Sequence, residues 1–130
     1  MAVIFGPSRW HFLKPAPDGG YLICISGGIK WIVAPESSEV GRTWHSRNDA
    51  VTTATNCTSA TGWFVPDVDQ LQNPGYCCRT YWDSYSTTLY WSSSQTICDN
   101  ALLVCFTTGG TFGNLKTATR CVRAFRCVTY

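Results

Sequence analysis

The cysteines are the first residues of this chain to consider for chemistry, because thiols can bind metal ions or form disulfides. The 130 residues include eight cysteines but only two histidines, His11 and His45. Structural zinc sites use closely spaced ligand pairs such as Cys-x2-Cys. The chain has no such pair, Cys77 and Cys78 are adjacent, and both histidines are distant from any cysteine pair. We therefore expect no metal site and no cofactor.

Two interpretations of the thiols remain open. Eight cysteines allow up to four disulfides, which are typical of an oxidising compartment. The same residues can also stay reduced and pack as small hydrophobic side chains. Residues 1–7 lack the basic region and apolar stretch of a signal peptide. A virus particle, assembled in the cytosol and later exposed to the outside, would reconcile both observations, as would the removal of a signal and stalk.

Aromatic residues are concentrated between Tyr76 and Tyr90. Tyr, Trp and Arg anchor interfaces because they bury a large, rigid area at low entropic cost. We predict a binding surface here, with at least two of its last three rings at an exposed or intersubunit surface. Its residues are Tyr76, Arg79, Tyr81, Trp82 and Tyr85. The alternative is that half of these rings cover the core.

Charge excludes some partners. Lys and Arg outnumber Asp and Glu by ten to eight, so bulk charge favours neither nucleic acid nor membrane binding. No apolar run is long enough for a membrane span. Residues 100–130 carry four basic residues and no acidic one. This segment suits a solvated strand face or an interface with an acidic neighbour.

The sequence pattern predicts an α+β fold. A hairpin is expected over 21–25 and 29–33, around Ser26-Gly27-Gly28. Further strands are expected over 89–93, 101–106 and 120–128. The last of these alternates, so Cys121 and Cys127 would share one face.

Two helices are expected between the hairpin and the later strands. Ser46 and Asp49 resemble a capping box, and Ala50, Ala54 and Cys57 would form the apolar face of the helix that follows. The second helix would begin at Asp67, with Gln70 at the reciprocal position, Val68 and Leu71 facing inward, and Asn73-Pro74-Gly75 at its end.

Residues 1–20 are predicted to be an extended N-terminal arm, and residues 21–130 the folded domain. Proline and glycine interrupt the arm repeatedly, so it cannot form a core of its own. We expect Trp10 and Phe12 to bury their rings under the domain's sheet or against another subunit, which makes the arm an assembly element.

Six short motifs in order resemble one known family. They are Gly28–Pro35, Trp44 before a helix, Gly62-Trp63-Phe64-Val65-Pro66, Tyr90-Trp91-Ser92-Ser93, Ala101 with Val104 and Phe106, and Cys121-Val122-Arg123. Together they resemble the Lcl C-terminal-like family, a branch of the C-type-lectin-like fold, over roughly residues 21–128. Two positions depart from the family pattern, where Phe64 and Asp67 replace its Arg and Thr.

The resemblance implies two helices packed on a twisted antiparallel sheet, with Trp31, Trp44, Trp63, Trp91 and Phe106 turned inward. In this fold the first helix packs near the last strand, which implies that Cys57 lies within bonding reach of Cys121 or Cys127, so that a disulfide is possible. The calcium motifs of sugar-binding lectins are absent, because Gln72-Asn73-Pro74 has the wrong order and Asp99-Asn100 lacks the required Trp.

The function expected from these features is non-enzymatic. The same fold occurs at receptor-binding tips of bacteriophages, so the leading hypothesis is a virion protein that decorates the capsid or ends a tail fibre. Its partners would be other virion proteins, further copies of itself and a host-surface glycan or protein. The alternative is a secreted or surface bacterial adhesin domain. A shortened formylglycine-type enzyme is the third, since enzymes of that class share the fold.

Overall fold

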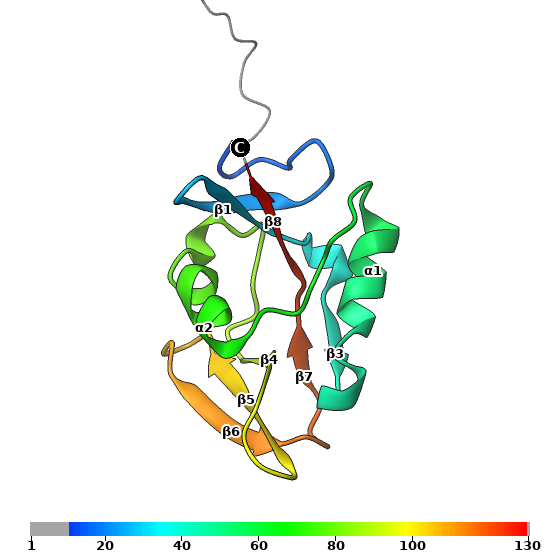
Figure 1. Cartoon of the computed structure of the whole chain (residues 1–130), viewed down its shortest axis with the longest axis vertical. Helices are drawn as coiled ribbons and strands as arrows, with labels where there is room; N and C mark the ends of the chain where they lie inside the picture. Colours follow the sequence, from blue (N-terminus) through cyan, green and yellow to red (C-terminus); the bar gives the residue numbers. More distant parts are fainter. Residues whose placement is uncertain (1–10, 130) are drawn as a thin grey trace, which may run out of the picture.

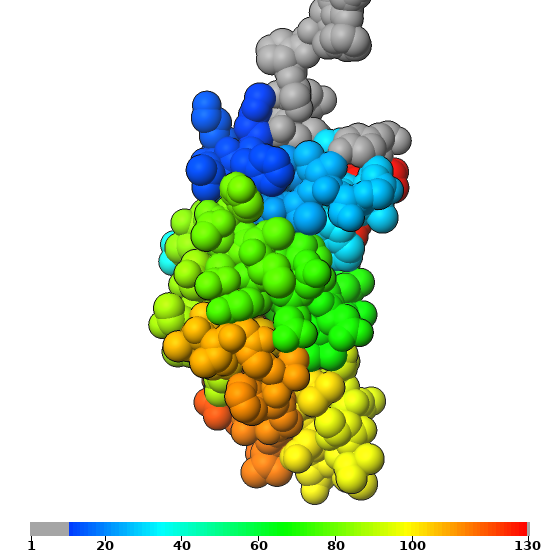
Figure 2. Space-filling view, turned by 90° about the vertical axis from the view of Figure 1, so that its left-hand side faces the viewer, coloured from blue at the N-terminus to red at the C-terminus, as the bar shows by residue number. Residues whose placement is uncertain are grey.

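A computed structural model describes residues 11–129, and Trp10 lies outside this range. The chain has an α+β fold in which helices pack beside two β-sheets (Figure 1). Residues 11–20 lie at one end of the molecule and the turn between β4 and β5 at the other (Figure 2). No helix within the described range is long and apolar enough to cross a membrane.

The first sheet has three antiparallel strands in the order β1-β2-β8. They are β1 (Tyr21–Ser26), β2 (Ile29–Val33) and β8 (Phe125–Thr129). Gly27 and Gly28 both have positive φ, 58° and 78°, as a tight two-residue hairpin turn requires. The predicted hairpin is confirmed.

The second sheet has five strands in the order β3-β7-β4-β5-β6. They are β3 (Val40–Arg42), β7 (Arg120–Val122), β4 (Leu89–Gln95), β5 (Asn100–Cys105) and β6 (Thr111–Leu115). Only β4 and β7 run parallel, paired at Tyr90 and Cys121, while the other described pairs in this sheet are antiparallel. Strand β6 was not predicted.

The last predicted strand is wrong as a single element. The segment divides at Arg123 and Ala124 into β7 and β8, which belong to different sheets and follow one another along the middle of the molecule (Figure 1). Both dividing residues are buried, and the Ala124 carbonyl accepts a hydrogen bond from the Ala34 amide at 2.9 Å. Cys121 and Cys127 therefore do not share one face of one strand.

The first helix, α1 (Asp49–Cys57), lies beside β3 and buries Ala50 and Ala54. Its predicted cap is wrong, because Ser46 belongs to the preceding turn η2 (Trp44–Ser46) and Asn48 occupies the N-cap without a side-chain bond. Cys57 is exposed and not part of the apolar face.

The second helix, α2 (Val68–Gln70), has the predicted capping box. The Asp67 carboxylate accepts from the Gln70 amide at 2.8 Å, and the Gln70 side chain accepts from the Asp67 amide at 3.0 Å. Leu71 is buried as expected, whereas Val68 is half-buried. The chain continues into a wider turn, η3 (Leu71–Tyr76), so Asn73-Pro74-Gly75 does not end the helical region at once.

Candidate functional site

The aromatic segment is largely turned into the core. Trp82 is only 4% exposed, and its ring lies between Tyr90, Phe106 and Phe125, with centroids 5.1–5.7 Å away. The prediction that Trp82 forms a recognition surface is therefore wrong. Trp31, expected in the core, is only half-buried. Trp82 is buried because it belongs to a core cluster with residues of both sheets, among them Val33 of the first and Val104 of the second.

The neighbouring predicted surface residues occupy several environments. Tyr81 is 37% exposed, while Tyr85 is half-buried edge-on to Trp82. Tyr76 packs edge-on against Phe106, and the Arg79 guanidinium lies 3.8 Å above the Tyr76 ring. Of the three rings expected to form the exposed patch, only Tyr81 is exposed.

The described part of the arm does not bury its aromatic residue under the sheet. Phe12 is 40% exposed, and its ring lies 4.7 Å from that of Tyr81 in the turn η4 (Arg79–Tyr81). Its burial against another subunit stays a prediction, and Trp10 lies outside the described residues.

No disulfide joins Cys57 to Cys121 or Cys127, and their predicted proximity stays a prediction. All eight cysteines lie in the described range and all carry free thiols. Cys57 ends α1, whereas Cys121 and Cys127 lie on strands of two different sheets, so the segment that was to place them together is divided.

A groove of about 580 Å³ opens in the larger sheet, lined by residues of β3, β4, β5 and β7 and of the segments beside them. Strands β4 and β7 run parallel, while β5 runs antiparallel to β4. The first residues of β4 and β7 therefore lie beside the last residues of β5, at the same end of these strands. Hydroxyl groups and one guanidinium dominate its polar lining. The lining residues are Gly41, Thr87, Thr88, Leu89, Cys105, Thr107, Thr119, Arg120 and Cys121.

The groove wall is held by the segment before β4. The Phe106 amide donates to the Thr88 carbonyl at 2.8 Å, and the Thr107 hydroxyl donates to the Thr87 carbonyl. The Thr88 hydroxyl lies 2.6 Å from that of Ser86 and 3.7 Å from the Cys121 sulfur. The two threonines are thus fixed by their backbones.

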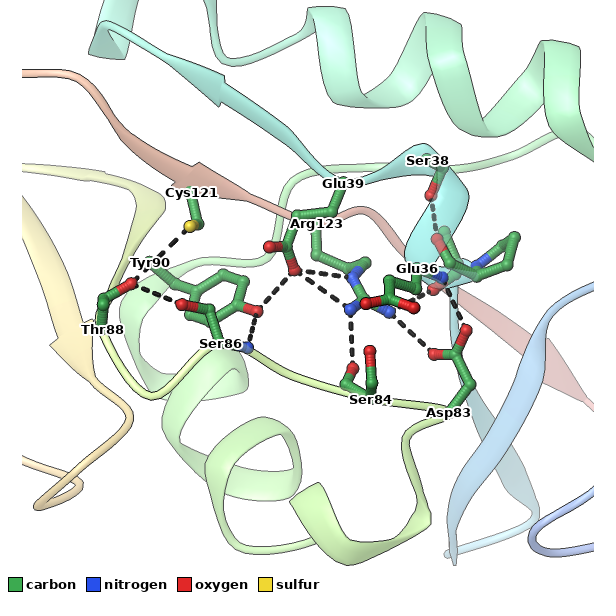
Figure 3. Close-up of polar contacts among 12 residues, drawn as sticks. Glu36, Ser38, Glu39, Asp83, Ser84, Ser86, Thr88, Tyr90, Cys121 and Arg123 are labelled. Atoms are coloured by element: carbon green, nitrogen blue, oxygen red, sulfur yellow. Dashed lines mark hydrogen bonds and ion pairs between the residues drawn. The ribbon is translucent and has the colours of Figure 1, made fainter.

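Behind the groove lies a network centred on Arg123, whose side chain is 0% exposed (Figure 3). Its guanidinium pairs with the carboxylates of Glu39 at 3.0 Å and Asp83 at 2.9 Å. It also donates to the carbonyls of Ala34 at 2.9 Å and Ser84 at 2.7 Å. A buried cation needs such complete pairing, because an unpaired one would be strongly destabilising.

Tyr90 links the network to the groove wall. Its hydroxyl donates to Glu39 and accepts from the Ser86 amide at 2.8 Å, while the Ser86 hydroxyl contacts Thr88 (Figure 3). Burial, followed by the hydrogen bond and charge of Glu39, raises the pKa of Tyr90. Tyr90 therefore stays protonated and serves as a fixed donor.

The two groove cysteines differ in their electrostatics. Burial raises the pKa of the Cys121 thiol, and the charge of Glu39 adds to this effect. Hydrogen bonds from the backbone of Thr107, and from the hydroxyl and backbone of Thr108, lower the pKa of the half-buried Cys105 thiol. Neither described histidine is among the lining residues.

The arrangement is suited to binding rather than to acid–base chemistry. The acidic and basic groups behind the groove are paired with one another. The groove surface is largely apolar, and its polar groups are mainly threonine hydroxyls and the Arg120 guanidinium. Within residues 11–129, no cluster of three or more His, Cys, Asp or Glu side chains could hold a metal ion.

The sequence analysis did not predict that Arg123, Glu39 and the groove threonines lie close together. One signal was present, because Arg123 stands between Val122 and Ala124-Phe125, and an arginine among apolar residues of a buried segment requires an acidic partner. The identity of its partners depends on contacts 40 and 84 positions away in the sequence.

Comparisons with known proteins give no assignment. No family model matches the chain, and no curated protein matches it.

Proposed function

We propose that this chain is a non-enzymatic, C-type-lectin-like binding domain on the exterior of a bacteriophage particle. The observation that carries the binding role is a largely apolar groove with threonine hydroxyls and Arg120 as its polar groups, backed by the self-paired Arg123 network. Groups that neutralise one another are poor acids and bases, but they hold a binding surface rigid. The resemblance to the Lcl C-terminal-like family supports the fold and the virion location.

The groove chemistry favours a hydroxylated ligand with an anionic group. Four threonines, Thr87, Thr88, Thr107 and Thr119, line the groove, and threonine hydroxyls can donate and accept as sugar hydroxyls do. The Thr107 hydroxyl, which donates to the Thr87 carbonyl, remains an acceptor. The Arg120 guanidinium, oriented by a hydrogen bond from its Nε to Asn114 at 3.1 Å, adds a positive charge at the rim. An acidic glycan of a host surface combines both features.

Two measurements test the proposal. Antibody detection in purified particles should find the chain at a fixed copy number, whereas recovery from a bacterial surface fraction would favour the adhesin alternative. Binding of acidic oligosaccharides to the purified chain should fall at least tenfold in Arg120→Gln.

Arg79→Gln is the matched control for this binding experiment, because Arg79 stacks on Tyr76 and does not line the groove. It should bind acidic oligosaccharides like the wild type. Equal losses in the two variants, or no binding by the wild type, would contradict the role of the groove.

A further inference from the structure

Two thiols meet between the first sheet and the turn that covers the core. Cys24 lies in β1, and Cys78 directly precedes η4, which packs against β1. After burial, the nearby Cys24 side chain is the main cause that raises the pKa of the Cys78 thiol, through its charge and hydrogen bonding. Both are half-buried and pack against the core cluster that contains Trp82 and Phe125.

Both backbones are held in place at this contact. Cys24 pairs with Trp31 across the hairpin, next to a bulge in β1. The Cys78 amide donates to the Pro74 carbonyl at 2.8 Å, and the Cys78 carbonyl accepts from the Tyr81 amide at 3.0 Å. The meeting of the two thiols therefore follows from the packing of two ordered elements.

We propose that Cys24 and Cys78 are a redox pair, which closes to a disulfide when the folded chain meets a small-molecule disulfide such as oxidised glutathione. One cysteine thiolate attacks a sulfur of the oxidant and releases one small thiolate, leaving a mixed disulfide. The second cysteine thiolate attacks the protein sulfur of that bond and releases the other small thiolate. Two protein thiols are oxidised, one small disulfide is reduced to two thiols, and the two protons lost by the protein are taken up by the released thiolates.

The local electrostatics set the speed of this reaction. Burial, and then the charge and hydrogen bond of Cys24, raise the pKa of Cys78 to about 11, and the charge of Cys77 adds to this. The titratable groups that face Cys78 are thus Cys24 from β1 and Cys77 from its own segment. Cys78 must react as a thiolate whichever cysteine attacks first, so closure should accelerate about tenfold per pH unit near neutrality.

The bond would join the first hairpin to the segment that carries Trp82. It would close a loop from residue 24 to residue 78, which removes conformational freedom from the unfolded chain. The oxidised chain is therefore expected to melt about 5–10 °C higher than the reduced chain. This inference does not depend on the groove or on the virion location.

The test is a non-reducing peptide map of the full chain after incubation with oxidised glutathione at pH 8.5. Free thiols are blocked with N-ethylmaleimide before digestion with trypsin. We expect the peptide of residues 10–30, whose only cysteine is Cys24, linked to the peptide of residues 48–79, with fragmentation placing the bond at Cys78. A bond to Cys57 or Cys77 instead, or only glutathione adducts on Cys24 and Cys78, would overturn the proposal.

Variants give a second, independent readout. Cys24→Ser should lose both the linked peptide and the rise in melting temperature, whereas the neighbouring Cys77→Ser should keep both. If Cys24→Ser does not fold, the wild-type map and its melting shift decide alone. A shift that survives in a folded Cys24→Ser, or is absent from a wild type carrying the bond, would contradict the stabilising role.

Discussion

Residues 76–88, which lead into β4, consist of two parts that differ in where their side chains lie. Both parts are rich in side chains that commonly bind ligands. The aromatic half, residues 76–85, sends Trp82 into the core and leaves only Tyr81 of its rings exposed. The hydroxyl half, residues 86–88, borders an open groove. Rings remove far more apolar area from water than hydroxyls do, so the aromatic half fills the interior and the polar half forms the site.

Replacing the central ring of the aromatic half should have the largest effect. Trp82→Ala removes a ring that contacts Tyr90, Phe106 and Phe125, so the free energy of unfolding should fall by about 4 kcal/mol. Urea denaturation measures this loss. Tyr81→Ala is the control and should lower the free energy by about 1 kcal/mol, since Tyr81 is exposed. Equal, small losses would show that Trp82 is not a core residue.

The network between the two halves should be nearly as sensitive. Arg123→Ala leaves the carboxylates of Glu39 and Asp83 without their cation in a largely buried place, at a cost of about 3 kcal/mol. Thermal and urea unfolding measure the change. Arg42→Ala breaks an exposed pair with Asp49 and should cost about 0.5 kcal/mol or less. A neutral result for Arg123 would contradict its role in joining the sheets.

The Tyr90 hydroxyl sharpens the comparison, because it connects the core to the groove wall. Tyr90→Phe should lower the free energy of unfolding by about 2 kcal/mol through the lost bonds to Glu39 and Ser86. The folded-state pKa of Tyr90 is raised above the unfolded value of 10.0, so the folded chain holds the proton longer. The contribution is therefore complete below about pH 10 and declines above it.

A urea series from pH 8 to 11 tests this pH dependence. The wild type should lose stability above about pH 10 more steeply than Tyr90→Phe, because only the wild type carries this proton. Parallel curves would show that Tyr90 titrates alike in the folded and unfolded chains.

The smallest effect on stability is expected in the hydroxyl half. Thr88→Val keeps the shape of an exposed side chain but loses its contacts with Ser86 and Cys121, so stability should change by about 0.5 kcal/mol or less. Oligosaccharide binding should nevertheless weaken, as calorimetry would measure. Thr52→Val on the exposed face of α1 is the control and should alter neither property.

Local signals in the sequence were sufficient for the hairpin and for the second helix. The turn at Gly27-Gly28 and the box of Asp67 and Gln70 depend on neighbouring residues only, and both are confirmed. The α+β class follows from the order of such elements. The core position of Trp82 does not, because a buried and an exposed aromatic residue look the same in a sequence without regular periodicity.

The division of the last strand and the groove were not predictable from local patterns. The alternation through residues 120–128 continues across the break, so periodicity gives no sign of it. The break depends on Arg123, whose partners Glu39 and Asp83 are remote in sequence. The groove depends in turn on the parallel pairing of β4 with β7, which joins residues about thirty positions apart.

The division between β7 and β8 has a consequence for biosynthesis. Strand β7 lies between β3 and β4, and β8 completes the other sheet beside β2. Until residues 120–129 have been translated, a nascent chain lacks β7, which links β3 to β4 in the larger sheet. It also lacks β8, an outer strand of the smaller sheet. Until then β3 lacks β7, its only strand neighbour among residues 11–129, and the carboxylates of Glu39 and Asp83 lack Arg123. Because these contacts span most of the chain, folding should be slow and should await the emergence of residues 120–129.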